Sequence, residues 1–161
     1  MRKFLLMVLA AITLASGAAF AQDDMMTDSS SWAGVSTGFP FGLVLHYGLE
    51  DLIAEDIDLR GNLSAVTFFG SFFFVNVGAD ALYQLNLETV NDLPLDVYAG
   101  GGLNVGVGIG DGVSFTGSVR ALGGAEYMFT DTIGAFGEVR IGVGVLQLFQ
   151  PSLSVGVNYH F

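Results

Sequence analysis

The chain has 161 residues, of which 52% are hydrophobic, 23 are glycine and only 13% are charged. Five lysines and arginines stand against 16 acidic residues, which gives a formal net charge of −11, and there is no cysteine. A soluble domain of this length normally carries far more charge. A chain this acidic has no basic patch for nucleic acid, and without cysteine it forms no disulfides.

The first 21 residues are typical of a signal peptide. Met1–Lys3 is basic, an apolar run follows from Phe4 to about Leu14, and Ala19–Ala21 has the small-x-small pattern of a cleavage site. We expect cleavage near Ala21, in preference to an uncleaved membrane anchor. Only three basic residues, all arginines, then remain against the 16 acidic ones. The mature chain is therefore expected to be exported and strongly acidic.

Residues 22–31, QDDMMTDSSS, are predicted to form a flexible acidic tail. From residue 32 to residue 161, which we take as one domain, apolar and small polar residues alternate, and this period of two favours strands over helices. All three prolines lie between the alternating runs, where strands tolerate them. The eight predicted strands cover approximately residues 32–38, 42–49, 56–67, 72–87, 95–107, 113–129, 134–145 and 152–161.

Residues 61–79 contain no charge and are long enough to be considered as a membrane helix. Glycine and asparagine interrupt this segment, and it continues the alternation of its neighbours. We therefore interpret it as parts of two strands.

The two faces of the predicted strands differ in composition. One face carries Val, Leu, Ile, Ala, Phe and Tyr, and the other carries mostly Gly, Ser, Thr and Asn with a few charges. A soluble lipocalin-like barrel would place its apolar face inside, whereas a membrane barrel places that face outside. A water-facing surface would carry many long charged side chains, while small residues suit the narrow lumen of eight strands. The pattern predicts an all-β fold, an eight-stranded antiparallel up-and-down transmembrane β-barrel.

The last predicted strand carries a terminal pattern at Val155, Val157, Tyr159 and Phe161. It resembles the C-terminal signal that outer-membrane β-barrels present to their assembly machinery. Together with the strands of residues 32–161, it makes the chain resemble the small outer-membrane β-barrel family of the OmpA transmembrane domain and OmpX-like proteins. The resemblance implies a bacterial outer-membrane location, contact with outer-membrane lipid, both chain ends in the periplasm, and the barrel-assembly machinery as a partner. We expect a monomer.

Charged residues on the small-residue face form the candidate site. A tight turn between the third and fourth strands puts Arg60 across from Asp80, and a turn around Thr132 puts Arg140 diagonal to Glu126. Unpaired charges in a narrow lumen are costly, so we predict a salt-bridge network that plugs the bore. The alternative is a polar pathway or gate for protons or small solutes. The predicted network comprises Asp58, Arg60, Asp80, Arg120, Glu126, Glu138 and Arg140.

No metal site, cofactor or catalytic centre is predicted. His46 and His160 fall two strands apart, roughly 10 Å, which is too far for joint ligation. Residues 56–61 echo a calcium loop but carry Arg60 at a ligand position, and the sequence has no nucleophile or phosphate-binding motif. Lipid A-modifying barrel enzymes resemble the chain in size, but they need a histidine near the outer leaflet, whereas both histidines here map to the periplasmic end.

Acidic residues gather in the predicted periplasmic connections, while the outward connections are short and rich in phenylalanine. This departs from the long polar loops of adhesins. The predicted function is a structural role in envelope integrity. The alternatives are a narrow channel or transporter for small or hydrophobic solutes, and a soluble periplasmic lipocalin-like ligand binder.

Overall fold

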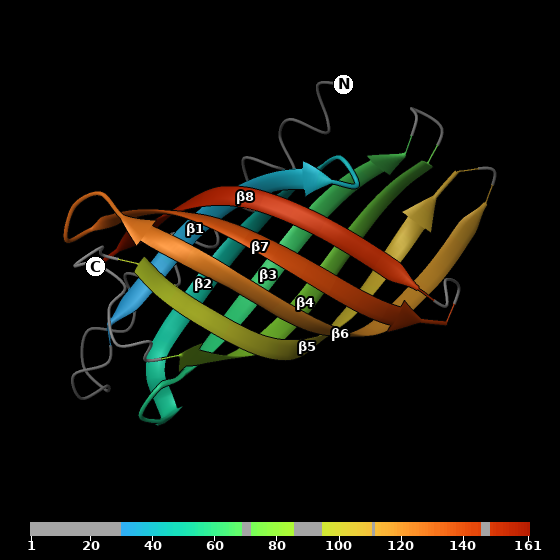
Figure 1. Ribbon diagram of the computed structural model, residues 1–161. Coiled ribbons are helices and arrows are strands. Elements are labelled where there is room, and N and C mark those ends of the chain that lie inside the picture. Colours follow the sequence, from blue (N-terminus) through green and yellow to red (C-terminus); the bar gives the residue numbers. More distant parts are fainter. Residues whose placement is uncertain (1–29, 69–71, 86–94, 111, 146–148) are drawn as a thin grey trace, which may run out of the picture.

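The computed structural model describes residues 30–68, 72–85, 95–110, 112–145 and 149–161. Each strand pairs antiparallel with its neighbour in sequence, and β8 pairs with β1, so the sheet closes into a barrel (Figure 1). The predicted fold class is confirmed. None of the described residues belongs to a helix that could cross a bilayer. The strands are β1 (Ser31–Phe39), β2 (Gly42–Ala54), β3 (Ile57–Phe68), β4 (Phe72–Leu85), β5 (Leu95–Ile109), β6 (Val113–Met128), β7 (Ile133–Gly144) and β8 (Gln150–His160).

The predicted signal peptide, residues 1–21, and residues 22–29 of the predicted tail lie outside the described residues. Ser31, predicted to belong to the tail, instead begins β1. Its backbone N–H donates to the carbonyl of Phe161 at 3.2 Å, and the Phe161 N–H donates to the Ser31 carbonyl at 2.9 Å. Pairing with the last strand therefore draws this residue into the sheet, and the β1–β8 seam has no unpaired edge there.

Strand β2 extends five residues beyond its predicted end at Leu49. The β2–β3 register shifts between Leu49 and Ala54, and Asp51 and Asp56 adopt positive φ angles of 53° and 69°. Side chains replace the regular ladder there: the Asp56 N–H donates to Asp51 Oδ1 at 3.0 Å, and the Asp51 N–H donates to Asp58 Oδ1 at 3.3 Å. Local aspartate bonds of this kind are common at turns, which explains why the sequence favours a loop here.

The outward face of the barrel is apolar along its length. Large hydrophobic side chains from all strands except β3 are exposed there, among them Val77, Leu103, Val105, Phe115, Val119, Val139, Val143 and Val155. Soluble monomers rarely expose a continuous apolar surface of this kind, whereas a lipid-facing barrel needs one. The three largest fully buried side chains are instead ionic: Arg60, Glu138 and Asp80.

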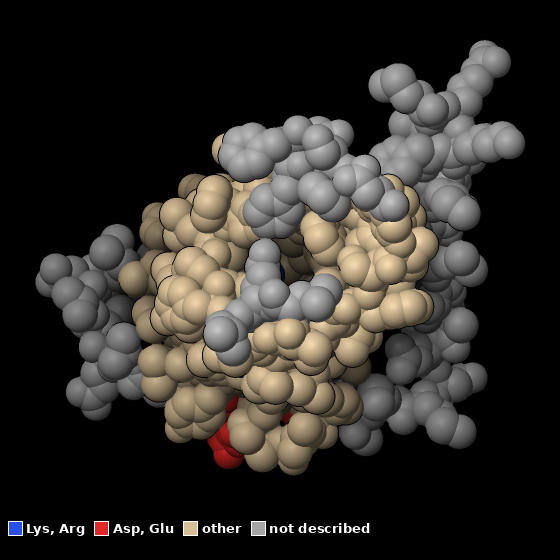
Figure 2. Space-filling view, turned by 90° about the vertical axis from the view of Figure 1, so that its right-hand side faces the viewer, with Lys and Arg blue, Asp and Glu red and all other residues tan. Residues whose placement is uncertain are grey.

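The barrel has two distinct ends. The end that holds Ser31 and Phe161 is called the terminal end below, and the opposite end, with the β1–β2 connection at Pro40, is called the distal end (Figure 1). Figure 2 looks onto the distal end, where the described side chains around a central hollow are uncharged. The charged residues that line the lumen thus lie below this rim.

Candidate functional site in the barrel lumen

Two cavities occupy the lumen, with a layer of charged side chains between them. The distal cavity has a volume of about 340 Å³, and the terminal cavity has a volume of about 290 Å³. We call the intervening charged side chains the ion layer. The ion layer consists of Arg60, Asp80, Arg120, Glu138 and Arg140.

Arg60 is the centre of the ion layer. Its Nε and Nη2 donate to Asp80 Oδ2 at 3.1 and 2.9 Å, and its Nη1 donates to Glu138 Oε2 at 2.7 Å. The Arg60 side chain is 1% exposed and both carboxylates are 0% exposed. Because β3 and β7 lie four strands apart in a ring of eight, the Arg60–Glu138 pair reaches across the bore.

Asp80 and Glu138 also hold the other two arginines. Arg120 donates from Nε to Asp80 Oδ1 at 2.8 Å and from Nη2 to Asn62 Oδ1 at 2.7 Å, while Arg140 donates from Nε to Glu138 Oε1. Asn62 in turn donates to Asp80 Oδ2 at 3.0 Å. Hydrogen bonds therefore surround both buried carboxylates, as buried ion pairs require.

Glycines on neighbouring strands make room for the large lumen side chains. Asp80 lies opposite Gly102, and a Cβ added at Gly102 would collide with the Asp80 carboxylate. In the same way, Gly48 lies under the ring of Trp32, and Gly124 lies beside the hydroxyl of Tyr98. The alternation of large and small residues across the strands thus fills a bore that eight strands leave narrow.

The register places Arg60 opposite Asp80, which is the pairing that the spacing around the β3–β4 turn predicts. The predicted approach of Arg140 to Glu126 is wrong, because Arg140 lies opposite Leu122. The turn is centred one residue earlier than predicted: Thr130 Oγ1 accepts the N–H of Ile133 at 3.0 Å. When the turn centre shifts by one residue, the residue opposite Arg140 shifts by two positions along β6. Glu126 then lies four positions from the residue opposite Arg140, beyond the reach of its side chain.

Two predicted network residues lie in the terminal cavity, outside the ion layer. Asp58 accepts a hydrogen bond from Gln84 Nε2 at 2.6 Å. Glu126 accepts one from Asn158 Nδ2 at 2.8 Å, and its Oε1 lies 3.1 Å from His160 Nε2. The structure therefore brings five of the seven predicted residues together and separates these two from them.

The two histidines have separate partners. His46 Nε2 lies 2.8 Å from Ser36 Oγ, and His160 lies 3.1 Å from both Glu50 and Glu126. Across the described ranges, no group of three or more potential metal ligands is found.

Sequence reasoning missed the polar residues that complete the lumen, such as Asn62 and Asn158. Asn62 follows Arg60 by two positions and so shares its face of β3, which was the available signal. Asn158 is two residues before His160 and likewise faces inward. Their partners lie on other strands, which periodicity does not identify.

The four residues of the C-terminal pattern, Val155, Val157, Tyr159 and Phe161, all face outward and are about half exposed. The ring of Phe161 lies 6.0 Å from that of Tyr159 and 6.5 Å from that of Tyr47. A second aromatic pair, Tyr127 and Phe129, has its ring centroids 5.2 Å apart. Outward aromatic groups at one end of a barrel are typical of the girdle at a membrane interface.

No family model matches the chain, and no curated protein matches it. Solved structures do. The N-terminal β-barrel domain of Pseudomonas aeruginosa OprF is 16% identical with a TM-score of 0.62, over 83% of this chain and 96% of that one. A major outer membrane protein from Thermus thermophilus is 14% identical with a TM-score of 0.60, and the match covers 84% of this chain and 100% of that one. Neisserial surface protein A is 16% identical with a TM-score of 0.57, and the match covers 83% of this chain and 94% of that one.

The chain has the fold of the small outer-membrane β-barrels. The exposed apolar face and the buried ions agree with this fold, since such barrels turn their apolar residues to lipid and their polar residues to the lumen. A soluble lipocalin-like barrel would have the opposite arrangement. The soluble alternative is therefore excluded, and the exposed apolar face is that of a membrane barrel.

Proposed function

We propose that this protein is a monomeric structural barrel of the bacterial outer membrane, with a role in envelope integrity and a lumen plugged by the ion layer. The observation that carries the proposal is the fully buried Arg60–Glu138 pair across the bore. A solute that passes must separate these charges or displace them. Removing one member of a buried pair costs several kcal/mol, about 3–5 in measured cases, so thermal opening of such a plug is rare.

A narrow channel is the alternative function, and the cavities on both sides of the ion layer favour it. In that case the ion layer would act as a gate, and the two cavities would act as its vestibules. Recordings in planar lipid bilayers separate the two functions. We expect the wild-type barrel to give no stable conductance steps, and reproducible open steps would overturn the plug.

The recording needs a variant that opens the bore and a matched control. The double variant Arg60→Ser/Glu138→Ser removes the pair that crosses the lumen, so it should conduct. Thr132→Ser, on the exposed β6–β7 turn, should behave as the wild type. Heat-modifiable gel migration of each sample confirms that the barrel is folded before it is recorded.

We propose no enzymatic role. The Ser36–His46 pair is the arrangement closest to a nucleophile and base that the described residues contain, but both residues are buried. His46 Nδ1 has no hydrogen-bond partner, so no third group orients the ring as a catalytic base requires. Its position against Phe136, with ring centroids 5.7 Å apart, is that of a packed lumen residue.

We also propose that the barrel-assembly machinery recognises the outward pattern of Val155, Val157, Tyr159 and Phe161. Phe161→Ala should reduce the fraction of heat-modifiable barrel in isolated outer membranes. Phe129→Ala is the matched control, because Phe129 is also an outward, exposed aromatic residue near the terminal end. Equal loss in both variants would mean that the interface girdle, and not the C-terminal pattern, is required.

A further inference from the structure

Four buried side-chain atoms of the described residues have no hydrogen-bond partner, and two of them belong to residues of the distal cavity, Arg140 Nη2 and Ser154 Oγ. Arg140 is 8% exposed and Ser154 is 7% exposed. They lie on β7 and β8, where Arg140 is opposite Ser152 and Ser154 is opposite Glu138. Arg140 and Ser154 are therefore diagonal neighbours, and both line the distal cavity. A buried donor without a partner is costly, which makes this corner of the cavity a place for a hydrogen-bond acceptor.

The charge of the ion layer also favours an acceptor, and in particular an anion, in the distal cavity. Its three guanidinium groups share only two carboxylates, Asp80 and Glu138. Arg60 contacts both of them, Arg120 contacts one and Arg140 contacts the other. The layer thus carries one excess positive charge, and Arg120 and Arg140 line the distal cavity. An anion in this cavity would balance that charge.

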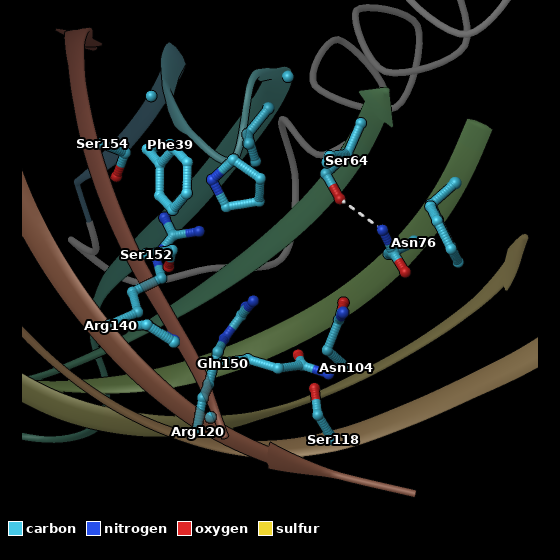
Figure 3. A pocket seen from close by; sticks show the side chains of 18 of the residues that line it. Phe39, Ser64, Asn76, Asn104, Ser118, Arg120, Arg140, Gln150, Ser152 and Ser154 are labelled. Atoms are coloured by element: carbon cyan, nitrogen blue, oxygen red, sulfur yellow. Dashed lines mark hydrogen bonds between the residues drawn. The ribbon is translucent and has the colours of Figure 1, made fainter. Parts of the chain in front are cut away.

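The walls of the distal cavity change in character from the ion layer to the rim. Near the arginines they are polar, as Figure 3 shows for Asn104, Gln150 and Ser154. Toward the distal end they become apolar and include Phe39 and Phe149. None of the described lining residues of this cavity carries a negative charge. A ligand that suits this gradient has an anionic head and an apolar body.

We propose that the distal cavity binds a small amphiphile with a carboxylate or phosphate head. The head accepts hydrogen bonds from Arg140 Nη2 and Ser154 Oγ, with Arg120 beside it, and the apolar body extends toward Phe39 and Phe149. Guanidinium groups recognise both kinds of oxyanion. The site lies on the distal side of the ion layer, so it is independent of whether the bore conducts.

Titration calorimetry of the full barrel in lipid nanodiscs tests the proposal with four soluble probes. Hexanoate and hexyl phosphate carry a head and an apolar body, acetate carries the head alone, and hexanol carries the body alone. Empty nanodiscs correct for partition into lipid. We expect hexanoate or hexyl phosphate to bind more tightly than acetate and hexanol, and the stronger of the two identifies the head group.

Two variants locate the binding site. Arg140→Gln removes the charge and should weaken binding roughly tenfold or more, because bonds to charged groups are the strong ones. Ser154→Ala removes only an unpartnered hydroxyl, so the barrel should fold normally and bind roughly threefold to tenfold more weakly. His160→Gln, at the terminal end, should leave the affinity unchanged.

Three results would overturn the proposal. These are the absence of binding by all four probes, hexanol binding as tightly as hexanoate and hexyl phosphate, and acetate binding as tightly as they do. If Ser154→Ala and a folded Arg140→Gln both bound the probes with the affinity of the wild type, the probes would bind elsewhere. That result would overturn the proposal as well.

Discussion

The two halves of the lumen differ although the same eight strands build both. In the terminal half the buried acids are matched: Glu126 contacts Asn158 and His160, and Asp58 contacts Gln84. In the distal half the described walls near the rim are uncharged, and the donors of Arg140 Nη2 and Ser154 Oγ have no partner, whereas the unmatched atom of the terminal half is an acceptor, Asn158 Oδ1. The ion layer separates a half that contains buried acids from a half that contains spare hydrogen-bond donors. One barrel wall can therefore carry two electrostatic environments.

The largest effect should follow from removal of the ion layer that separates the halves. Glu138→Ala leaves Arg60 and Arg140 without their shared carboxylate, so the free energy of unfolding should fall by about 3–5 kcal/mol. Urea unfolding in lipid vesicles measures it. Glu50→Ala is the control, since Glu50 is a partly exposed partner of His160 and its loss should cost about 0–1 kcal/mol. If the free energy of unfolding fell equally in both variants, the ion layer would contribute no more to stability than an ion pair at the terminal end.

Crowding the ion layer from the neighbouring strand should have a smaller effect. The added methyl group of Gly102→Ala meets the Asp80 carboxylate and the Ala79 carbonyl oxygen, and should cost about 1–3 kcal/mol by overpacking. Gly137→Ala is the matched control, because no atom lies within 4 Å of the added Cβ. The same unfolding assay compares them, and a neutral Gly102→Ala would mean that Asp80 and the adjoining β4 backbone can move without loss of stability.

Loss of one polar group from each half tests the comparison directly. Asn158→Ala removes a bond to a buried carboxylate and should cost about 1.5–3 kcal/mol. Ser154→Ala, without ligand, removes a hydroxyl that has no partner and should change stability by less than about 0.5 kcal/mol. If Ser154→Ala destabilised the barrel as much as Asn158→Ala does, the distal half would not have spare donors.

A difference of about 1 kcal/mol is expected from the backbone at the rim of the terminal half. Asp56 has a φ of 69°, which costs a residue with a Cβ roughly 1–2 kcal/mol. Asp56→Ala should therefore be about 1 kcal/mol less stable than Asp56→Gly in urea unfolding. Both variants remove the same carboxylate, so their difference isolates the backbone. An equal stability would show that this turn relaxes to another conformation.

The fold was accessible to sequence reasoning because its signal is local and repeated. Alternation assigned most residues to the correct face, as the outward Val77 and the inward Asp80 show. The spacing around the β3–β4 turn also predicted the register of Arg60 against Asp80 correctly. Where a side chain sets the turn, as Thr130 does, the estimated centre was wrong by one residue, and the partner of Arg140 was wrong with it.

The sequence by itself determined which side chains face lipid and which face the lumen, because a strand alternates its faces with a fixed period of two. It also determined that the few inward charges are of both signs. The tertiary structure decided which of them meet. Arg60 and Glu138 are 78 residues apart and share neither a strand nor a hairpin. Only closure of the ring brings β3 and β7 face to face, and this closure creates both the ion layer and the unmatched corner at Arg140 and Ser154.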